Sequence, residues 1–341
     1  MNKKTIILLS SIALVLIAYF LLNRNISNTL TGDDKNFAYN NTSKIDKIFI
    51  TNKSSKEYVT LKKTDEKNWV VNDKFKASNS QIDLLLETMR KLKVKKPVGK
   101  AELEPVVKNM SLNGTKVEVY ENGKLSKVFY VGGNTYDELG TYFYMENAKE
   151  PYVCHIPGFV GFLNTRFFTN LNAWRSKVIF DHTPEQIKTI EVNWTEQTQK
   201  SFTIDNQSSS PSLTANGKVY SNPNQINLNL LRSYLALWEN LCYEGFPIDL
   251  NPKMIDSIAN KTNPILVITL TDKNNEKTTM QVHRKGLKKD SYQQTDNLGN
   301  PLDFEMENFY AFINGNKTEI VQIQDFVFGK VMKINNDFQI K

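Results

Sequence analysis

Histidine and cysteine, the side chains that most often act as general acids, general bases and nucleophiles, are few in this sequence. The 341 residues include three histidines and two cysteines. Cys154 and His155 are neighbours in a segment with strand character, so their side chains should point to opposite faces and cannot easily form a thiol–imidazole pair. We therefore expect Cys154 to be a small buried residue. A disulfide with Cys242 is the alternative outside the cytoplasm.

Other arrangements of polar residues also fall short of a recognised site. The cysteines and histidines lack the spacing of zinc ligands, and Asp296-Asn297-Leu298-Gly299 is better explained as a turn than as a calcium loop. Gly132-Gly133 ends a strand instead of opening a helix, unlike a phosphate-binding loop, and Asp181-His182 reads as a turn at a boundary. We expect no catalytic, cofactor-binding or metal-binding residues and hence no enzyme. A hydrolase with an unfamiliar arrangement is the remaining alternative.

Charge is shared unevenly along the chain. Residues 44–177 carry 23 basic and 15 acidic side chains, a net charge of +8, whereas residues 181–341 carry 16 and 19, a net charge of −3. The densest group of cations is Arg90, Lys91, Lys93, Lys95, Lys96 and Lys100. Such a patch suits anionic lipid headgroups or an acidic partner, and the plainer interpretation is a solvated helix end. We expect no nucleic acid partner outside the cytoplasm.

The uncharged run from Thr5 to Leu22 predicts a membrane-spanning helix. Its eighteen residues follow two lysines and would reach roughly 27 Å, close to the thickness of a hydrocarbon core of about 30 Å. The lysines favour a cytoplasmic N-terminus and an extracytoplasmic (periplasmic) location for the bulk of the chain. We expect a single-pass protein of the inner (cytoplasmic) membrane, with residues 1–24 as its anchor and residues 25–43 as a tether.

Two other interpretations of this segment remain open. A cleaved signal peptide usually has a shorter apolar run and a small-residue cleavage site, which the end of this run does not offer. A buried core helix would be less uniformly apolar. A lipoprotein is excluded because no cysteine follows the run.

The remainder of the chain predicts two related halves, residues 44–180 and 181–341. Each begins with an alternating strand, at 44–50 and 186–192. A helix follows, capped by Ser78 in the first half and by Asn222 in the second.

Each predicted helix leads into a hairpin, at 115–131 around Asn122-Gly123 and at 265–283 around a looser turn. The ends of the halves match without a gap at a shift of 167 residues, so that Tyr142-Phe143 falls on Phe309-Tyr310. The fold class expected is therefore α+β, with an N-terminal transmembrane helix and two tandem repeats of an antiparallel sheet covered by one helix. We expect Trp174, Trp194 and Trp238 in the core or along a groove.

Two stretches carry a resemblance to a known family. They are residues 159–180, which begin Phe159-Val160-Gly161-Phe162, and the C-terminal run from Asn308 to Phe328. These stretches resemble bacterial proteins carrying the domain of unknown function 4340, over most of residues 44–335. The resemblance implies a membrane-anchored protein of unsettled activity, and some relatives are associated with gliding-type ABC transporter systems.

The sequence therefore favours a membrane-anchored, extracytoplasmic scaffold or accessory subunit of an envelope complex, which the resemblance links to an ABC-type transporter. Its expected partners are the inner membrane, through residues 5–22, and a protein of the envelope, and its oligomeric state stays open. The alternative function is an extracytoplasmic ligand-binding module that holds a peptide or glycan in the cleft between the two repeats, near Trp174 or Trp238.

Overall fold

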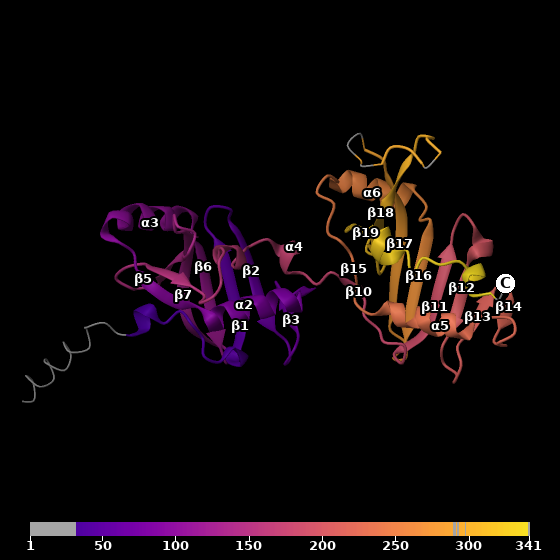
Figure 1. Ribbon diagram of the computed structural model, residues 1–341, viewed down its shortest axis with the longest axis horizontal. Helices are drawn as coiled ribbons and strands as arrows, with labels where there is room; N and C mark the ends of the chain where they lie inside the picture. Colours follow the sequence, from indigo (N-terminus) through magenta and orange to yellow (C-terminus); the bar gives the residue numbers. More distant parts are fainter. Residues whose placement is uncertain (1–31, 289–290, 292, 297, 340–341) are drawn as a thin grey trace, which may run out of the picture. The chain divides into compact units, whose positions relative to one another are not determined.

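The computed structural model describes residues 32–339 except 289, 290, 292 and 297 (Figure 1). The chain divides into two compact units, the first ending at Ser176 and the second beginning at Lys177. The anchor expected at 1–24 and the first part of the tether expected at 25–43 lie outside the described residues. Within the described part, no helix has the length and apolar character needed to cross a bilayer.

The first unit is built on a nine-stranded antiparallel sheet with the order β4-β3-β2-β1-β6-β7-β8-β9-β5. The hairpin predicted around Asn122-Gly123 joins β6 to β7, and both turn residues have positive φ, 51° and 75°. The strands are β1 (Ile45–Asn52), β2 (Glu57–Lys63), β3 (Trp69–Val71), β4 (Phe75–Lys76), β5 (Lys93–Pro97), β6 (Thr115–Glu121), β7 (Lys124–Asn134), β8 (Thr141–Met145) and β9 (Tyr152–His155).

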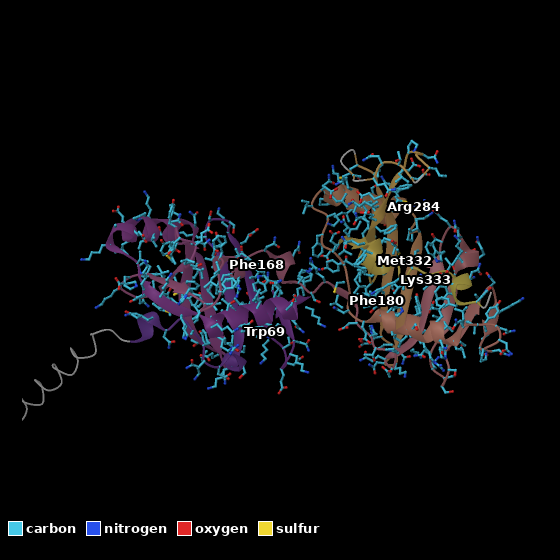
Figure 2. All side chains as sticks on the ribbon, in the orientation of Figure 1. Trp69, Phe168, Phe180, Arg284, Met332 and Lys333 are labelled. Carbon is cyan, nitrogen blue, oxygen red and sulfur yellow. The ribbon has the colours of Figure 1, made fainter. Side chains whose placement is uncertain are left out.

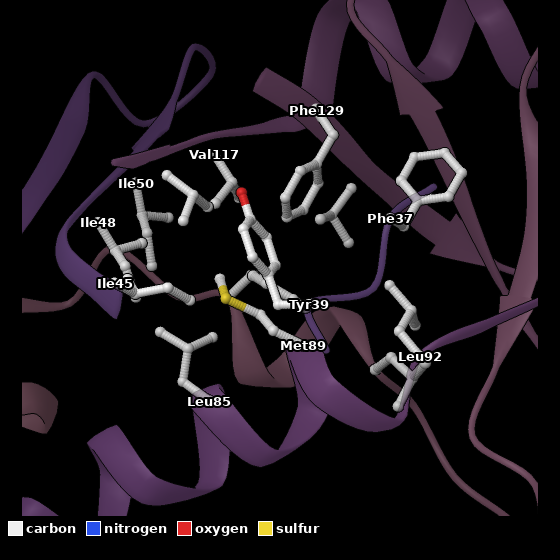
Figure 3. Packing of buried hydrophobic residues seen from close by; sticks show 14 of the residues in the cluster. Phe37, Tyr39, Ile45, Ile48, Ile50, Leu85, Met89, Leu92, Val117 and Phe129 are labelled. Carbon is white, nitrogen blue, oxygen red and sulfur yellow. The ribbon is translucent and has the colours of Figure 1, made fainter. Parts of the chain in front are cut away.

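One face of this sheet is covered by helix α2 (Asn79–Lys91), as the apolar stripe of that segment predicts. Leu85 and Met89 of α2 are fully buried against the inward side chains of β1 (Figure 3). Alternation along β1 puts Ile48 and Ile50 into this core and turns Phe49 away from it. The short helix α4 (Leu171–Trp174) ends the unit and adds the buried Trp174 to the same core.

A second helix, α3 (Lys100–Asn113), packs on the opposite face of the first sheet. Its Val106 and Met110 form a small cluster with Val153 of β9. Met110 lies so close to Gly132 of β7 that a Cβ at that position would come within 2.7 Å of its side chain. The expectation of one helix on one face was therefore wrong, because each face of the sheet has apolar side chains and a helix of its own.

The second unit contains an eight-stranded antiparallel sheet with the order β14-β13-β12-β11-β16-β17-β18-β19. A separate two-stranded sheet pairs β10 (Val178–Phe180) with β15 (Leu241–Cys242). The strands of the large sheet are β11 (Ile187–Trp194), β12 (Phe202–Asp205), β13 (Ser212–Ala215), β14 (Lys218–Tyr220), β16 (Leu266–Asp272), β17 (Lys277–Gly286), β18 (Phe304–Ile313) and β19 (Val321–Gln324).

Helices also cover both faces of the second sheet. Helix α5 (Leu228–Leu235) buries Leu231 and Leu235 in the larger core, whereas α6 (Pro252–Lys261) packs Ile255 and Ile258 on the other face. Figure 1 shows α6 at the top and α5 at the bottom of this unit. A third helix, α7 (Asp325–Phe328), follows β19 and buries Phe328.

Both predicted helix caps need correction. Ser78 does precede α2, but its hydroxyl lies 3.0 Å from that of Ser80 and forms no side-chain bond to the helix backbone. The second helix starts later than expected, because Asn227 is its N-cap and accepts a hydrogen bond from the Leu230 amide. Asn222 accepts from the amide of Asn224 in a preceding turn. Asn222, the polar residue chosen as the cap, therefore belongs to the turn that precedes the helix.

The second unit also holds a nearly buried ion pair. Lys285 Nζ lies 3.1 Å from Glu305 Oε2, and the two side chains are only 10% and 12% exposed. Lys285 also donates to Gln322 Oε1 over 2.9 Å, and Asn308 Nδ2 donates to Glu305. The other carboxylate oxygen, Glu305 Oε1, accepts from the Ser291 hydroxyl over 3.2 Å, so both oxygens of Glu305 have partners.

Replacement of Lys285 by alanine is expected to lower the free energy of unfolding of the second unit by about 3 kcal/mol, because the carboxylate of Glu305 would stay buried without a counter-ion. The control is Arg284→Ala at the adjacent position (Figure 2), which removes an exposed ion pair with Glu196 and should cost less than about 1 kcal/mol. Urea unfolding followed by circular dichroism measures both. Equal losses in the two variants would contradict the assignment of Lys285 as a buried structural cation.

Candidate functional site

The two cysteines occupy different environments, and both are free. Cys154 is fully buried in the first core, where burial raises the pKa of its thiol, and the neighbouring His155 is half-buried. The predicted role of Cys154 as a small core residue is confirmed. The alternative disulfide is not formed, and Cys242 lies in the second unit with its side chain partly exposed.

The other two histidines are held by structural contacts. His182 follows Asp181 after β10; its Nδ1 accepts from the Asp181 amide over 3.3 Å, and its own amide donates to the Trp238 carbonyl over 3.0 Å. His283 of β17 is buried, its Nδ1 lies 2.9 Å from Thr262 Oγ1, and burial lowers its pKa. In the described residues no three or more His, Cys, Asp or Glu side chains are grouped so that they could hold a metal ion.

Two of the tryptophans considered for a ligand cleft do not line one. Trp174 and Trp238 are fully buried in separate cores, whereas Trp194 is partly exposed and donates from its indole to the Lys333 carbonyl. Asp296 accepts hydrogen bonds from the amides of Leu298 and Asn300, the geometry of a turn.

A groove of about 700 Å³ lies between α3 and the second face of the first sheet. Its wall consists of one side of α3, and Tyr130 of β7 and Tyr144 of β8 form the floor, with ring centroids 6.2 Å apart. The α3 residues that line it recur at helical spacing and are Leu103, Val107, Met110 and Ser111. The groove exists because α3 is buried only along its Val106–Met110 side and leaves the adjoining strands open.

Polar groups stand at one end of this groove. Lys116 Nζ lies 2.8 Å from Glu118 Oε1 and 3.9 Å from Glu146, and the hydrogen bond to Glu118 raises the pKa of the lysine. Burial works against ionisation of Glu118, but hydrogen bonds from Lys116 and Tyr120 hold the pKa of its carboxyl below the ordinary value. One lysine here is paired with two carboxylates, so Lys116 is not free to bind an anionic ligand.

The tyrosine hydroxyls in the floor are also occupied. Tyr144 donates to the Ala148 carbonyl over 2.8 Å and Tyr130 donates to Glu146. Within the described residues, Lys53 and Lys149 at the rim have no ion-pair partner. The groove thus offers ring faces and aliphatic side chains inside, with two unpaired ammonium groups at its mouth.

The basic residues singled out in the sequence lie along one edge of the first unit. Arg90 and Lys91 belong to the last turn of α2, Lys93, Lys95 and Lys96 to the edge strand β5, and Lys100 begins α3. A helix end therefore accounts for only part of the group.

Comparison with protein families matches residues 69–254 to the domain of unknown function DUF4340. The chain belongs to this family. The DUF4340 match covers more than half of the chain, includes α3 and runs from β3 in the first unit to α6 in the second. It is narrower than the resemblance over residues 44–335 suggested, and the C-terminal run 308–328 lies beyond it. Comparisons with curated proteins and with solved structures gave no match.

Sequence reasoning missed the groove because it missed α3. Pro105 lies within that helix and argues against one, and the apolar residues of the segment are divided between the sheet-facing side and the groove. The spacing of Leu103, Val107 and Met110 was the available signal.

Proposed function

We propose that this DUF4340 protein is a membrane-anchored, extracytoplasmic accessory subunit that acts by binding, with the groove of the first unit as its contact for a partner protein of the envelope. Residues 5–22 would anchor it in the inner membrane. The observation that carries this proposal is the apolar groove beside α3, the kind of concave surface that serves as a binding site. An association with an ABC-type transporter is part of the proposal and rests on the family resemblance alone.

Introduction of arginine at Leu14, in the middle of the apolar run, is expected to release the chain from the membrane. A cation at the centre of a spanning helix costs about 2.5–3.5 kcal/mol of insertion free energy. Asn2→Arg, before the run, is the control and should stay in the membrane fraction. Fractionation and the activity of a C-terminal alkaline phosphatase fusion provide the measurements.

The anchor proposal fails if the fusion to the unaltered chain is inactive, since alkaline phosphatase works only after export. Full-length protein recovered from the soluble fraction without detergent would contradict it equally.

We also propose that the two units are tandem repeats of one ancestral domain. The support is their common order from β1 and from β11 onward, which is four strands, a helix, a short strand, a helix and four strands; β10 precedes this order in the second unit. In both sheets the first strand pairs with the strand after the second helix, β1 with β6 and β11 with β16. The segment after the first helix also lies beside the last strand in each unit, as β5 beside β9 and as Gly245 bridged to Gln322 of β19.

The occupant we propose for the groove is an apolar segment of a protein partner that carries a carboxylate. Aliphatic side chains of α3 and the two tyrosine rings suit apolar side chains. The unpaired Lys53 and Lys149 at the mouth suit an acidic residue or a C-terminal carboxylate. A glycan is less well matched because both tyrosine hydroxyls already have partners inside the protein.

Val107→Asp is expected to abolish this contact. Val107 is 47% exposed and lines the groove, so the substitution leaves the core intact but places a charge where apolar groups would be buried. A photo-crosslinking amino acid at Ser111 reports capture of the partner segment in intact membranes, and we expect its yield to fall by about tenfold or more.

The matched control is Leu112→Asp. Leu112 is on the same helix and 59% exposed but does not line the groove, so capture should persist. The account is wrong if capture survives Val107→Asp, or if mass spectrometry of the adduct identifies a glycan or a segment without apolar residues.

A further inference from the structure

The loop after β9 carries an exposed apolar tip. Val160 is 79% exposed, and Phe159 and Phe162 on either side are each 38% exposed. Large apolar side chains grouped at a surface loop generally mark a contact with another molecule or with a membrane. This loop begins the stretch 159–180, which resembles the DUF4340 family and lies within the residues matched to it. None of its three apolar residues lines the groove beside α3.

Cations from three elements lie beside Phe159 of this tip. A hollow of about 570 Å³ is lined by Phe159 together with Arg90 and Lys91 of α2, Lys93 of β5 and Arg166. We call these five residues, together with Val160 and Phe162, the basic loop surface.

Arg166 contacts both the loop and helix α2. The guanidinium of Arg166 lies 4.4 Å from the centroid of the Phe159 ring and donates to Thr88 Oγ1 over 2.8 Å. Arg166 therefore connects Phe159 of the loop to Thr88 of α2. These contacts fix the position of the loop relative to the cations of α2.

The carboxylate that lines this hollow does not neutralise the surface. Glu87 lies 2.6 Å from Lys91 and 4.0 Å from Arg90, so it offsets one of the four cations. Lysines on an edge strand such as β5 also prevent pairing with another sheet. That role explains Lys95 and Lys96, but it explains neither the exposed aromatic rings nor Arg90 on α2.

The start of the described chain runs close to this surface. Phe37 packs its ring 6.3 Å from that of Tyr152 in β9, and the Tyr39 amide donates to the carbonyl of Met89, next to Arg90. The ten residues between Arg24 and Lys35 span at most about 40 Å even when fully extended. An anchor at residues 5–22 would therefore keep this edge of the first unit near the bilayer.

We propose that the basic loop surface binds the anionic headgroups of the membrane in which the chain is anchored, with Val160 and the flanking rings entering the headgroup region. This inference rests on the proposed anchoring. Cations around an apolar tip combine the two attractions that hold peripheral segments on anionic bilayers. The short reach between Arg24 and Lys35 favours the membrane over an acidic protein as the partner of this surface.

A polarity-sensitive fluorophore at Val160→Cys tests the proposal in the full-length chain with Cys242→Ser, since Cys154 is buried. The protein is reconstituted into vesicles of phosphatidylcholine alone or mixed with phosphatidylglycerol. We expect a blue shift and protection from an aqueous quencher only when phosphatidylglycerol is present. Phe326→Cys, an exposed position after β19 in the second unit, is the control and should not respond.

Charge removal identifies the cations responsible. Each cation near an anionic surface contributes about fivefold in affinity. Arg90→Gln with Lys93→Gln should therefore lower the apparent affinity of the loop for phosphatidylglycerol roughly 25-fold. Lys218→Gln with Lys277→Gln removes two exposed charges from the second unit and should have no effect. An unchanged spectrum at position 160 overturns the proposal, as does an equal response to soluble polyglutamate, which would indicate an acidic protein partner.

Flotation of the same vesicles separates this proposal from the anchor. If the chain floats with both kinds of vesicle while the fluorophore stays in water, the anchor is supported and the lipid-binding role of the basic loop surface is refuted. If the chain floats only with vesicles that contain phosphatidylglycerol, and the fluorophore is protected, the anchor is refuted and the lipid-binding role of the basic loop surface is supported.

Discussion

The need to cover both faces of a wide antiparallel sheet governs the architecture of this protein. In the first unit α2 packs over one face and joins the main hydrophobic core, while α3 covers only part of the other face. The fit of Met110 over Gly132 brings α3 close to β7, and the strands beside it keep their outward side chains open to solvent. The groove proposed as the partner site is thus a direct consequence of a helix that covers only part of a broad sheet.

The second unit meets the same constraint with a different surface. Helix α6 packs Ile255 and Ile258 against Tyr310 and Phe312, and β17 to β19 carry the buried Lys285 pair. Residues 181–341 are net acidic, whereas the groove and the basic loop surface both belong to the basic first unit. If the units are repeats, the binding role proposed for the first arose by changes on its surface, with the order of its elements retained.

Local patterns predicted the α+β fold, the first hairpin and the core position of Cys154, because turn chemistry and alternation act over a few residues. They failed where tertiary packing decides. Helix α3 contains Pro105 and is stabilised by contact with β7 and β9, which no local pattern reveals. Asn222 has the chemistry of a cap, but the chain uses it in a turn and begins α5 after Asn227. The groove is lined by residues of β1, α3, β7 and β8, which are far apart in the sequence. Only the folded sheet brings them together.

Hydrogen exchange of the Gly132→Val variant tests most directly whether the seating of α3 on the sheet creates the binding face. Valine suits a strand, but its side chain would occupy the space that Met110 fills. The account predicts that amides of α3 lose protection while those of α2 keep it. Unchanged protection across Lys100–Asn113, or equal loss in α2, would contradict it.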